Sequence, residues 1–241
     1  MRRSRTRTTA TPLVTSVLAL LLAIALTGCG GNDTSESDRS SSGDSSGDGN
    51  GQDDQEGQDA KRPAPQYKRL TKAQLDQVLL TIEDLPPGYS ADPKDDSSST
   101  AKYCGSAPPK VPVKSKARQD FTKGGGFSSE LASVSVVQYR SAATAARHYK
   151  RLRAGLATCK GETVSGDQVT YALMSTPKTG HPTLGIRVSA KDFTVLIDIA
   201  QVGPSLVNSG SGGITTTDAD LAASLLMQQV DKYKAAAAPG G

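Results

Sequence analysis

Residues 183–202 read TLGIRVSAKDFTVLIDIAQV, two apolar runs separated only by Lys191 and Asp192. Runs rich in Val, Ile and Thr are typical of strands, and a two-residue polar link between them indicates a tight hairpin. We therefore expect strands over 183–190 and 193–202. Consecutive strands with so short a link pair antiparallel, which decides the kind of sheet this chain can form.

The elements on either side of this hairpin complete the fold. Alternation predicts strands over 131–139 and 168–175, and apolar residues at helical spacing predict helices over 71–80, 141–158 and 217–234. The order is helix, strand, helix, three strands, helix. It predicts a single α+β domain with an antiparallel sheet and helices packed on one face.

The start of this domain carries clear boundary signals. Thr71 is a suitable N-cap and Gln74 follows three residues later, as in a capping box. The segment DLPPGY at 84–89 then ends the helical pattern with two prolines and a glycine. Residues 92–126 are rich in Ser, Pro and Gly, so we expect irregular chain there.

The N-terminal 28 residues have the pattern of a secretory signal, with four arginines followed by an apolar run over 13–26. That run is shorter than the roughly 20 residues that a membrane-spanning helix needs. It leads into LTGC at 26–29, which resembles the bacterial lipobox. We predict that residues 1–28 are removed and that Cys29 carries the lipid (diacylglycerol and palmitate). A plain anchor helix and an ordinary cleaved signal are the alternatives.

The composition changes abruptly after the lipobox. Residues 30–59 contain no Val, Ile, Leu, Met or aromatic residue, and nine acidic residues against one basic. Such a segment cannot bury enough apolar surface to fold. We predict a disordered acidic linker over 29–66, one α+β domain over 67–236 and a flexible tail over 237–241. The GDSSG motif at 43–47 matches a serine-hydrolase pattern, but neither a strand nor a helix flanks it, so we assign it no catalysis.

The net charge of +4 hides a split between segments. Residues 1–28 contribute +4, residues 30–59 contribute −8, and residues 60–241 hold 23 Lys and Arg against 15 Asp and Glu. A basic domain at a membrane is attracted to anionic headgroups or wall polymers. A solvated surface of mixed charge is the plainer alternative. The candidate basic residues are the stretch KVPVKSKAR at 110–118 and Arg147, Lys150, Arg151 and Arg153.

Two cysteines remain once Cys29 carries a lipid. An exported chain meets an oxidising space, so we predict a disulfide between Cys104 and Cys159. The bridge closes a loop of about 56 residues, worth roughly 4 kcal/mol in the chain-entropy model. Two free thiols or a metal site are the alternatives. Neither His148 nor His181 has metal-ligand spacing to a cysteine, so we predict no metal and no cofactor.

Short motifs follow one another in a distinctive order: LL at 79–80, DLPPGY at 84–89, Cys104, a strand ending near Tyr139, small residues at 142–146, and Cys159. This order resembles actinobacterial lipoproteins with a kinase-type sensor domain, similar to the extracellular domain of a mycobacterial receptor serine/threonine kinase. The resemblance implies an α+β domain with a cleft between sheet and helices that binds an unidentified extracellular ligand. It transfers no catalytic residue. The kinase sensor domain has two disulfides, and this chain can form one.

No residue pattern supports an enzyme. His148 lies in the expected central helix and His181 in a loop before Pro182, and a structural histidine is the plainer interpretation of both. A hydrolase is the third choice. We predict a monomeric lipoprotein, facing outside the cell and bound to the membrane through Cys29, that binds a small-molecule, lipid or wall-polymer ligand. The alternative is an interaction protein that docks anionic lipid, wall polymer or a protein through its basic surface. Nucleic acid is excluded as a partner by the expected location.

Overall fold

The expected hairpin forms within a computed structural model that describes residues 66–94, 104, 113–164, 166–214 and 217–239. Its two strands are β6 (Thr183–Ala190) and β7 (Phe193–Val202). They pair antiparallel, with Ala190 opposite Phe193, so Lys191 and Asp192 make the turn as predicted.

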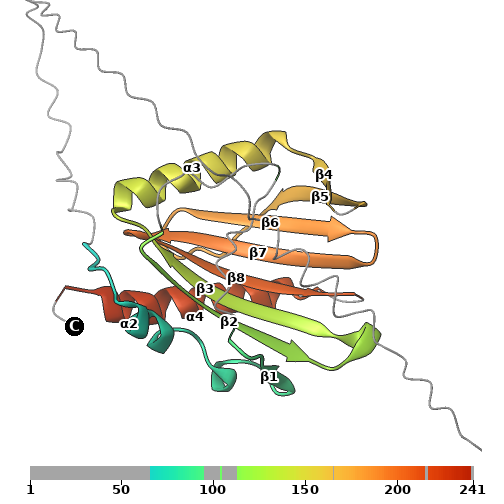
Figure 1. Cartoon of the computed structure of the whole chain (residues 1–241), viewed down its shortest axis with the longest axis horizontal. Helices are drawn as coiled ribbons and strands as arrows, with labels where there is room; N and C mark the ends of the chain where they lie inside the picture. The colour runs from blue at the N-terminus through green and yellow to red at the C-terminus, as the bar shows by residue number, and fades with distance from the viewer. Residues whose placement is uncertain (1–65, 95–103, 105–112, 165, 215–216, 240–241) are drawn as a thin grey trace, which may run out of the picture. The chain divides into compact units, whose positions relative to one another are not determined.

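A single antiparallel sheet extends this hairpin in the order β1-β2-β3-β8-β7-β6-β5-β4 (Figure 1). The other strands are β1 (Tyr89–Ala91), β2 (Ser115–Lys123), β3 (Glu130–Gln138), β4 (Gly161–Val164), β5 (Asp167–Met174) and β8 (Ser205–Gly213). The helices are α2 (Lys72–Gln77), α3 (Ala142–Thr158) and α4 (Ala219–Ala237), with short 3-10 turns η1 (Ile82–Asp84) and η2 (Gly126–Ser128). The predicted α+β fold, an antiparallel sheet with helices packed on it, is confirmed.

Two long strands lie where the sequence did not predict them. β2 lies within residues 92–126, which were expected to be irregular, and only its Ala117 and Phe121 are buried. β8 occupies the centre of the sheet, between β3 and β7, and most of its residues are Ser or Gly. The extra strands make the sheet wider than the sequence indicated.

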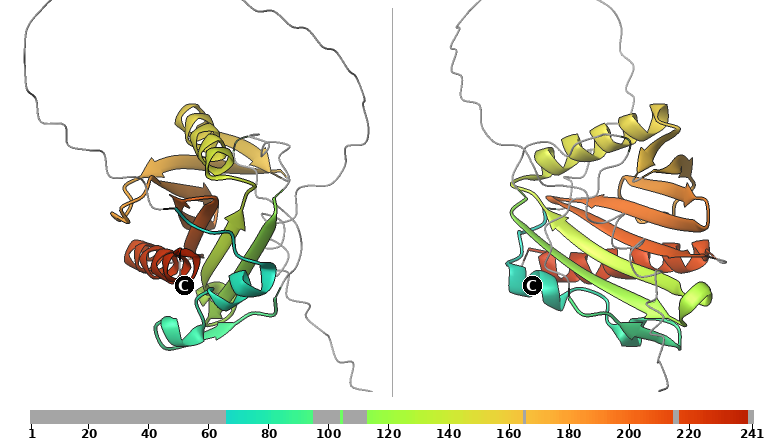
Figure 2. Two further views of the ribbon diagram at one scale, coloured as in Figure 1. Left: turned by 90° about the vertical axis from the view of Figure 1, so that its left-hand side faces the viewer. Right: turned by 45° about the vertical axis from the view of Figure 1, so that its right-hand side comes forward.

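The two long helices cover opposite faces of the sheet, which corrects the expectation that the helices share one face (Figure 2). On β7, Ala200 packs with the α4 side chains, whereas its neighbour Ile199 packs with those of α3. Successive strand residues point to opposite faces, so adjacent residues meet different helices. The cause lies in the central strands, which carry apolar or small residues on both faces and therefore need a cover on each.

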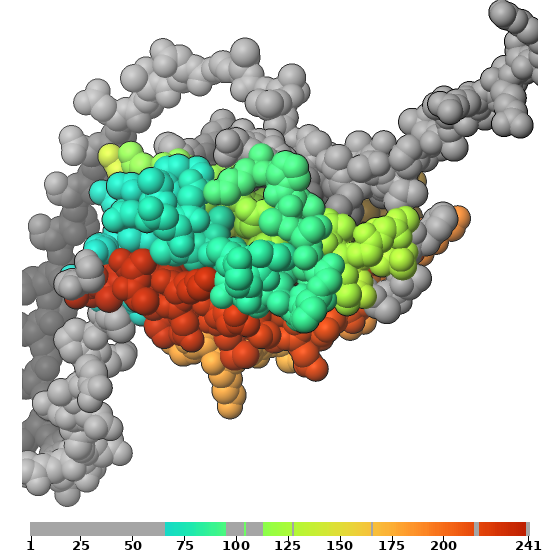
Figure 3. Space-filling view, turned by 90° about the horizontal axis from the view of Figure 1, so that it is seen from below, coloured from blue at the N-terminus to red at the C-terminus, as the bar shows by residue number. Residues whose placement is uncertain are grey.

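Polar contacts fix α4 to its face of the sheet. The hydroxyls of Ser205 and Tyr233 lie 2.8 Å apart, and Ser209 Oγ donates to the carbonyl of Ala222 over 2.8 Å. The Gln229 side chain accepts from Leu80 N and donates to Val78 O, over 3.0 and 2.8 Å. Residues 66–94 therefore lie against α4, as Figure 3 shows.

The start of the domain meets its end. Lys68 N donates to Ala237 O over 2.8 Å, just before the buried Leu70. Tyr67 packs on Gly203, whose φ is +53° and where a Cβ would lie 2.9 Å from the Tyr67 ring. Among the described residues, no helix has the length and apolar character needed to cross a bilayer.

Candidate functional site

The predicted disulfide between Cys104 and Cys159 is present, with Cα atoms 5.8 Å apart. Cys159 ends α3, and Cys104 N donates to the Glu162 carboxylate of β4 over 3.1 Å. The bridge thus fixes one point of the segment after β1 to the C-terminal end of α3. The predicted lipidation site, Cys29, lies outside the described residues.

An open groove of about 480 Å³ runs beside α3, between the helix and the ends of two strands. The helix contributes Ala146, Tyr149, Lys150, Arg153, Ala154 and Ala157. Pro182, just before β6, and Gln201, near the end of β7, form the other wall. We call this the α3 groove. Its floor consists mainly of alanine and proline carbons, and its charged groups come from α3.

A short chain of contacts orders the rim of the α3 groove. Tyr149 is 5 % exposed and donates its hydroxyl to Thr183 O over 2.6 Å, which ties α3 to β6. Burial raises the pKa of Tyr149, and the positive charge of nearby Arg153 partly opposes this. The phenol therefore stays neutral, and Arg153 lies beside it at the rim.

The charge of α3 is entirely positive. Its 17 residues contain no Asp or Glu, and its four cations are all exposed: Arg147, Lys150, Arg151 and Arg153. The ion pairs found in the described part of the chain involve other residues. The helix therefore presents a cationic outer surface, as the sequence predicted.

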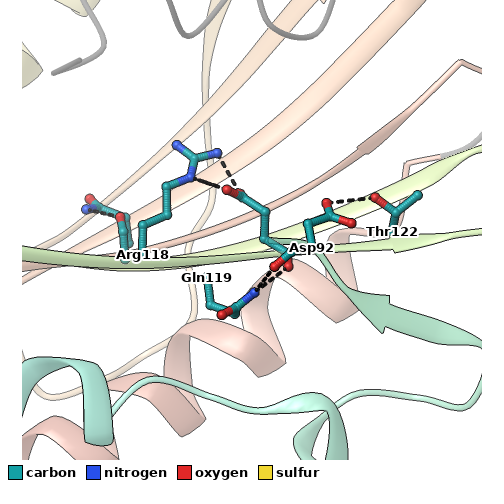
Figure 4. A network of polar contacts seen from close by, with 7 residues as sticks. Asp92, Arg118, Gln119 and Thr122 are labelled. Carbon is teal, nitrogen blue, oxygen red and sulfur yellow. Dashed lines mark hydrogen bonds and ion pairs between the residues drawn. The ribbon is translucent and has the colours of Figure 1, made fainter. Parts of the chain in front are cut away.

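The predicted basic stretch 110–118 does not join this surface as a unit. Residues 110–112 lie outside the described chain, and Val113 packs beside the α3 core. Arg118 is on β2, where its guanidinium forms a two-nitrogen ion pair with Asp120 at 2.6 Å (Figure 4). That pairing neutralises Arg118 locally.

The same strand holds the chain after β1. Gln119 Nε2 donates to Asp92 O, and Thr122 Oγ1 donates to the Asp92 carboxylate, each over 2.9 Å (Figure 4). These contacts support the edge of the sheet, so this polar network has a structural role.

The two histidines occupy separate places. His148 lies beside Tyr139 with ring centroids 5.4 Å apart, and burial, with Arg151 nearby, lowers its pKa. The ring centroids of His181 and Tyr67 lie 5.9 Å apart. Burial and the charge of Lys234 lower the pKa of His181, and the charge of Asp231 opposes them only in part. The described residues contain no group of three or more His, Cys, Asp or Glu placed to hold a metal ion.

A second hollow, of about 410 Å³, lies between the segment at Pro86 and α4. Two of its three carboxylates already have partners within the fold. Asp84 forms an ion pair with Lys232 at 2.6 Å, and Asp218 caps α4 by accepting from Leu221 N over 2.8 Å. We therefore regard the α3 groove as the stronger site.

Sequence reasoning identified the cations of α3 and the helix beside which a cleft was expected. It missed Tyr149 as a positioning residue, and it missed Pro182 and Gln201 as the opposite wall. Their part depends on which strand ends lie beside α3. Because β8 was not predicted, the sequence could not place those ends.

Comparison with known proteins identifies the fold. No family model and no curated protein sequence matches this chain. The extracellular domain of PknH from Mycobacterium tuberculosis superposes with a TM-score of 0.55 at 14% identity, covering 70% of this chain and 99% of that domain. An uncharacterized protein from Mycobacterium smegmatis, the Rv0999 ortholog, gives a TM-score of 0.43 at 9% identity, covering 68% of this chain and 97% of its own. The resemblance expected from the short motifs is thus confirmed for the fold of the PknH domain.

Proposed function

We propose that this protein is a lipoprotein that displays a binding domain outside the cell. Cys29 carries the lipid, the acidic segment 29–66 separates the domain from the membrane, and the domain over 67–236 binds a ligand in the α3 groove. The lipobox, the charge split, the disulfide and the fold shared with an extracellular domain support this proposal. The protein acts by binding and catalyses no reaction.

The observation that carries the proposal is the α3 groove. Ligand sites are concave, mostly apolar hollows of roughly 300–1,000 Å³ with a few placed polar groups. The α3 groove has a volume of about 480 Å³, a small-residue floor and an ordered rim. It lies beside the helix at 141–158, and the resemblance implied a cleft between sheet and helices.

Blocking the groove tests this function. Ala157→Trp places a large ring on the exposed floor, so we expect it to exclude any ligand that copurifies with the protein. Native mass spectrometry of the gently purified protein measures the bound mass. Ala143→Trp is the matched control, because Ala143 is an exposed alanine of α3 that does not line the groove. Equal occupancy in both variants would place the ligand elsewhere and contradict the proposal.

A second candidate function is favoured by the uncompensated charge of α3. If the protein has this second function, its domain docks on an anionic envelope polymer or lipid surface. The whole cationic side of α3 makes the contact, and no ligand occupies the groove. Cosedimentation with anionic vesicles or wall polymer at low and high salt separates the two functions. Surface docking weakens with added salt and tolerates Ala157→Trp, whereas groove binding is lost in that variant.

A further inference from the structure

Arg153 lies at the rim of the α3 groove, beside Tyr149. The Tyr149 hydroxyl donates to Thr183 O over 2.6 Å. Tyr149 is nearly buried, so this wall of the groove is anchored in the core. The planar fork of the Arg153 guanidinium suits oxyanions.

Lys150 supplies a second positive charge at the same rim. It precedes Arg153 by three residues, so the two side chains are neighbours on the helix surface, with Cβ atoms about 5–6 Å apart. Neither cation belongs to the ion pairs of the described chain, and α3 has no carboxylate of its own. Adjacent like charges repel weakly, and an anion bound between them removes that repulsion.

The kind of anion follows from the number of donors. A carboxylate is satisfied by one guanidinium fork, whereas a phosphate has three oxygens and a charge of up to about −2. It can therefore use the Arg153 fork and the Lys150 ammonium together. The floor of Ala146, Ala154 and Ala157 carries only methyl groups and suits an apolar or flat unit beside the anion.

We propose that the α3 groove binds a phosphate group attached to an apolar or sugar unit, with Arg153 and Lys150 holding the phosphate and the alanine floor holding the attached unit. This inference rests on the proposed function, because it names the ligand class of the same groove. Such phosphates occur in lipid headgroups and in soluble sugar phosphates, and the experiment distinguishes the two sources.

The test uses matched small probes on the full chain with Cys29→Ser, so that no lipid is attached. Phenyl phosphate, inorganic phosphate and phenyl glucoside are titrated while backbone amide shifts are followed by NMR. We expect phenyl phosphate to bind more tightly than either other probe and to move the amides of residues 146–157 and Gln201. Arg153→Gln should weaken its binding about ten- to hundredfold, as for a lost charged hydrogen bond.

Arg151→Gln is the matched control. Arg151 precedes Arg153 by two residues, about 200° around the helix, and lies beside His148 instead of the groove. We expect its effect on phenyl phosphate binding to stay within about twofold. Equal losses in both variants would mean a diffuse electrostatic attraction and would overturn the assignment of a phosphate site.

Two further outcomes distinguish a failure of the phosphate inference from a failure of the proposed groove-binding function. Phenyl glucoside that binds the groove as tightly as phenyl phosphate overturns the phosphate class and leaves groove binding intact. Phenyl phosphate that leaves the groove amides unmoved overturns the inference directly. Vesicles of phosphatidic acid in phosphatidylcholine identify the source, because phosphatidic acid carries the same kind of phosphate monoester. Vesicle binding that Arg153→Gln abolishes points to a headgroup, and binding of the soluble probe alone points to a soluble phosphate.

Discussion

Asp198 has an environment that opposes its usual charge. It lies in β7 on the face that α4 covers, is fully buried, and neither carboxylate oxygen has a hydrogen-bond partner among the described residues. A Cβ at Gly185 would lie 3.0 Å from Asp198 Oδ1, so the strand alongside leaves room for this carboxyl group. Burial raises the pKa of Asp198 to about 6. The sequence places Asp198 within an apolar run, but it shows neither its burial nor its lack of a partner.

Replacing Asp198 by Asn should change how stability depends on pH. Because the pKa is raised in the folded state, this group contributes full stability below its unfolded pKa of about 3.9 and loses that contribution as pH rises through about 6. The loss amounts to about 3 kcal/mol. We expect Asp198→Asn, which stays neutral, to be more stable than the parent at pH 8 and to lose this advantage at pH 4.

Urea unfolding at pH 4, 6 and 8 measures the difference between parent and variant. Asp192→Asn serves as the control, because Asp192 lies exposed in the turn of the same hairpin. Its free energy of unfolding should follow the parent at each pH. An Asp198→Asn curve that runs parallel to the parent across the whole range would contradict an unpartnered buried carboxyl group.

At the scale of elements, the helices were predictable because their signals are local. The capping box of Thr71 and Gln74 forms as expected, and Ser141 caps α3. Asp218 caps α4 by accepting from Leu221 N. The strands β6 and β7 followed from their β-branched runs. β8 could not be predicted, because its Ser and Gly residues reflect how closely its neighbours approach and not its own propensity.

Gly212 in β8 tests whether the glycines of this strand are needed because its neighbours approach closely. A Cβ there would lie 2.8 Å from Thr194 O and 3.0 Å from a Val195 methyl, although its backbone needs no positive φ. We expect Gly212→Ala to lower the free energy of unfolding by about 1–3 kcal/mol through overpacking. Denaturant unfolding measures this loss.

The matched control is Gly125→Ala, where a new Cβ would meet nothing within 4 Å. Its φ of −166° is extended backbone that any residue adopts. The same substitution should therefore leave stability unchanged or raise it slightly, by limiting the unfolded chain. If both alanines had equal effects, close packing of β8 would not explain its glycines.

At the scale of the whole molecule, charge divides the sequence into segments of opposite sign. The acidic segment 30–59 precedes a domain with an excess of cations, four of which lie on α3. Composition alone predicted this division, because net charge is additive along a sequence. The α3 groove could not be predicted in the same way, since its walls are about 25 to 55 residues apart and meet only in the folded sheet.

Cys29→Ser tests the anchor. We expect the variant to lose incorporation of a labelled fatty acid and to leave the membrane pellet for the soluble fraction, because the Cys29 thiol is the proposed attachment point. Fractionation and fatty-acid labelling in the producing bacterium measure both effects. Cys104→Ser with Cys159→Ser controls for the loss of cysteine as such and should remain labelled. A Cys29→Ser protein that still sediments with membranes after a high-salt wash would show that another feature holds the chain there.

The central position of β8 sets the order in which this protein can fold. β3 and β7 both pair with it, and Ser135 bonds Asn208 across 73 residues of chain. Until residues 205–213 are available to pair, the earlier strands can form only two separate half-sheets, each with an unpaired edge. Contacts so distant in sequence slow folding and expose intermediates to aggregation. The sheet therefore closes after synthesis is nearly complete, and a chain truncated before β8 has no route to the native structure.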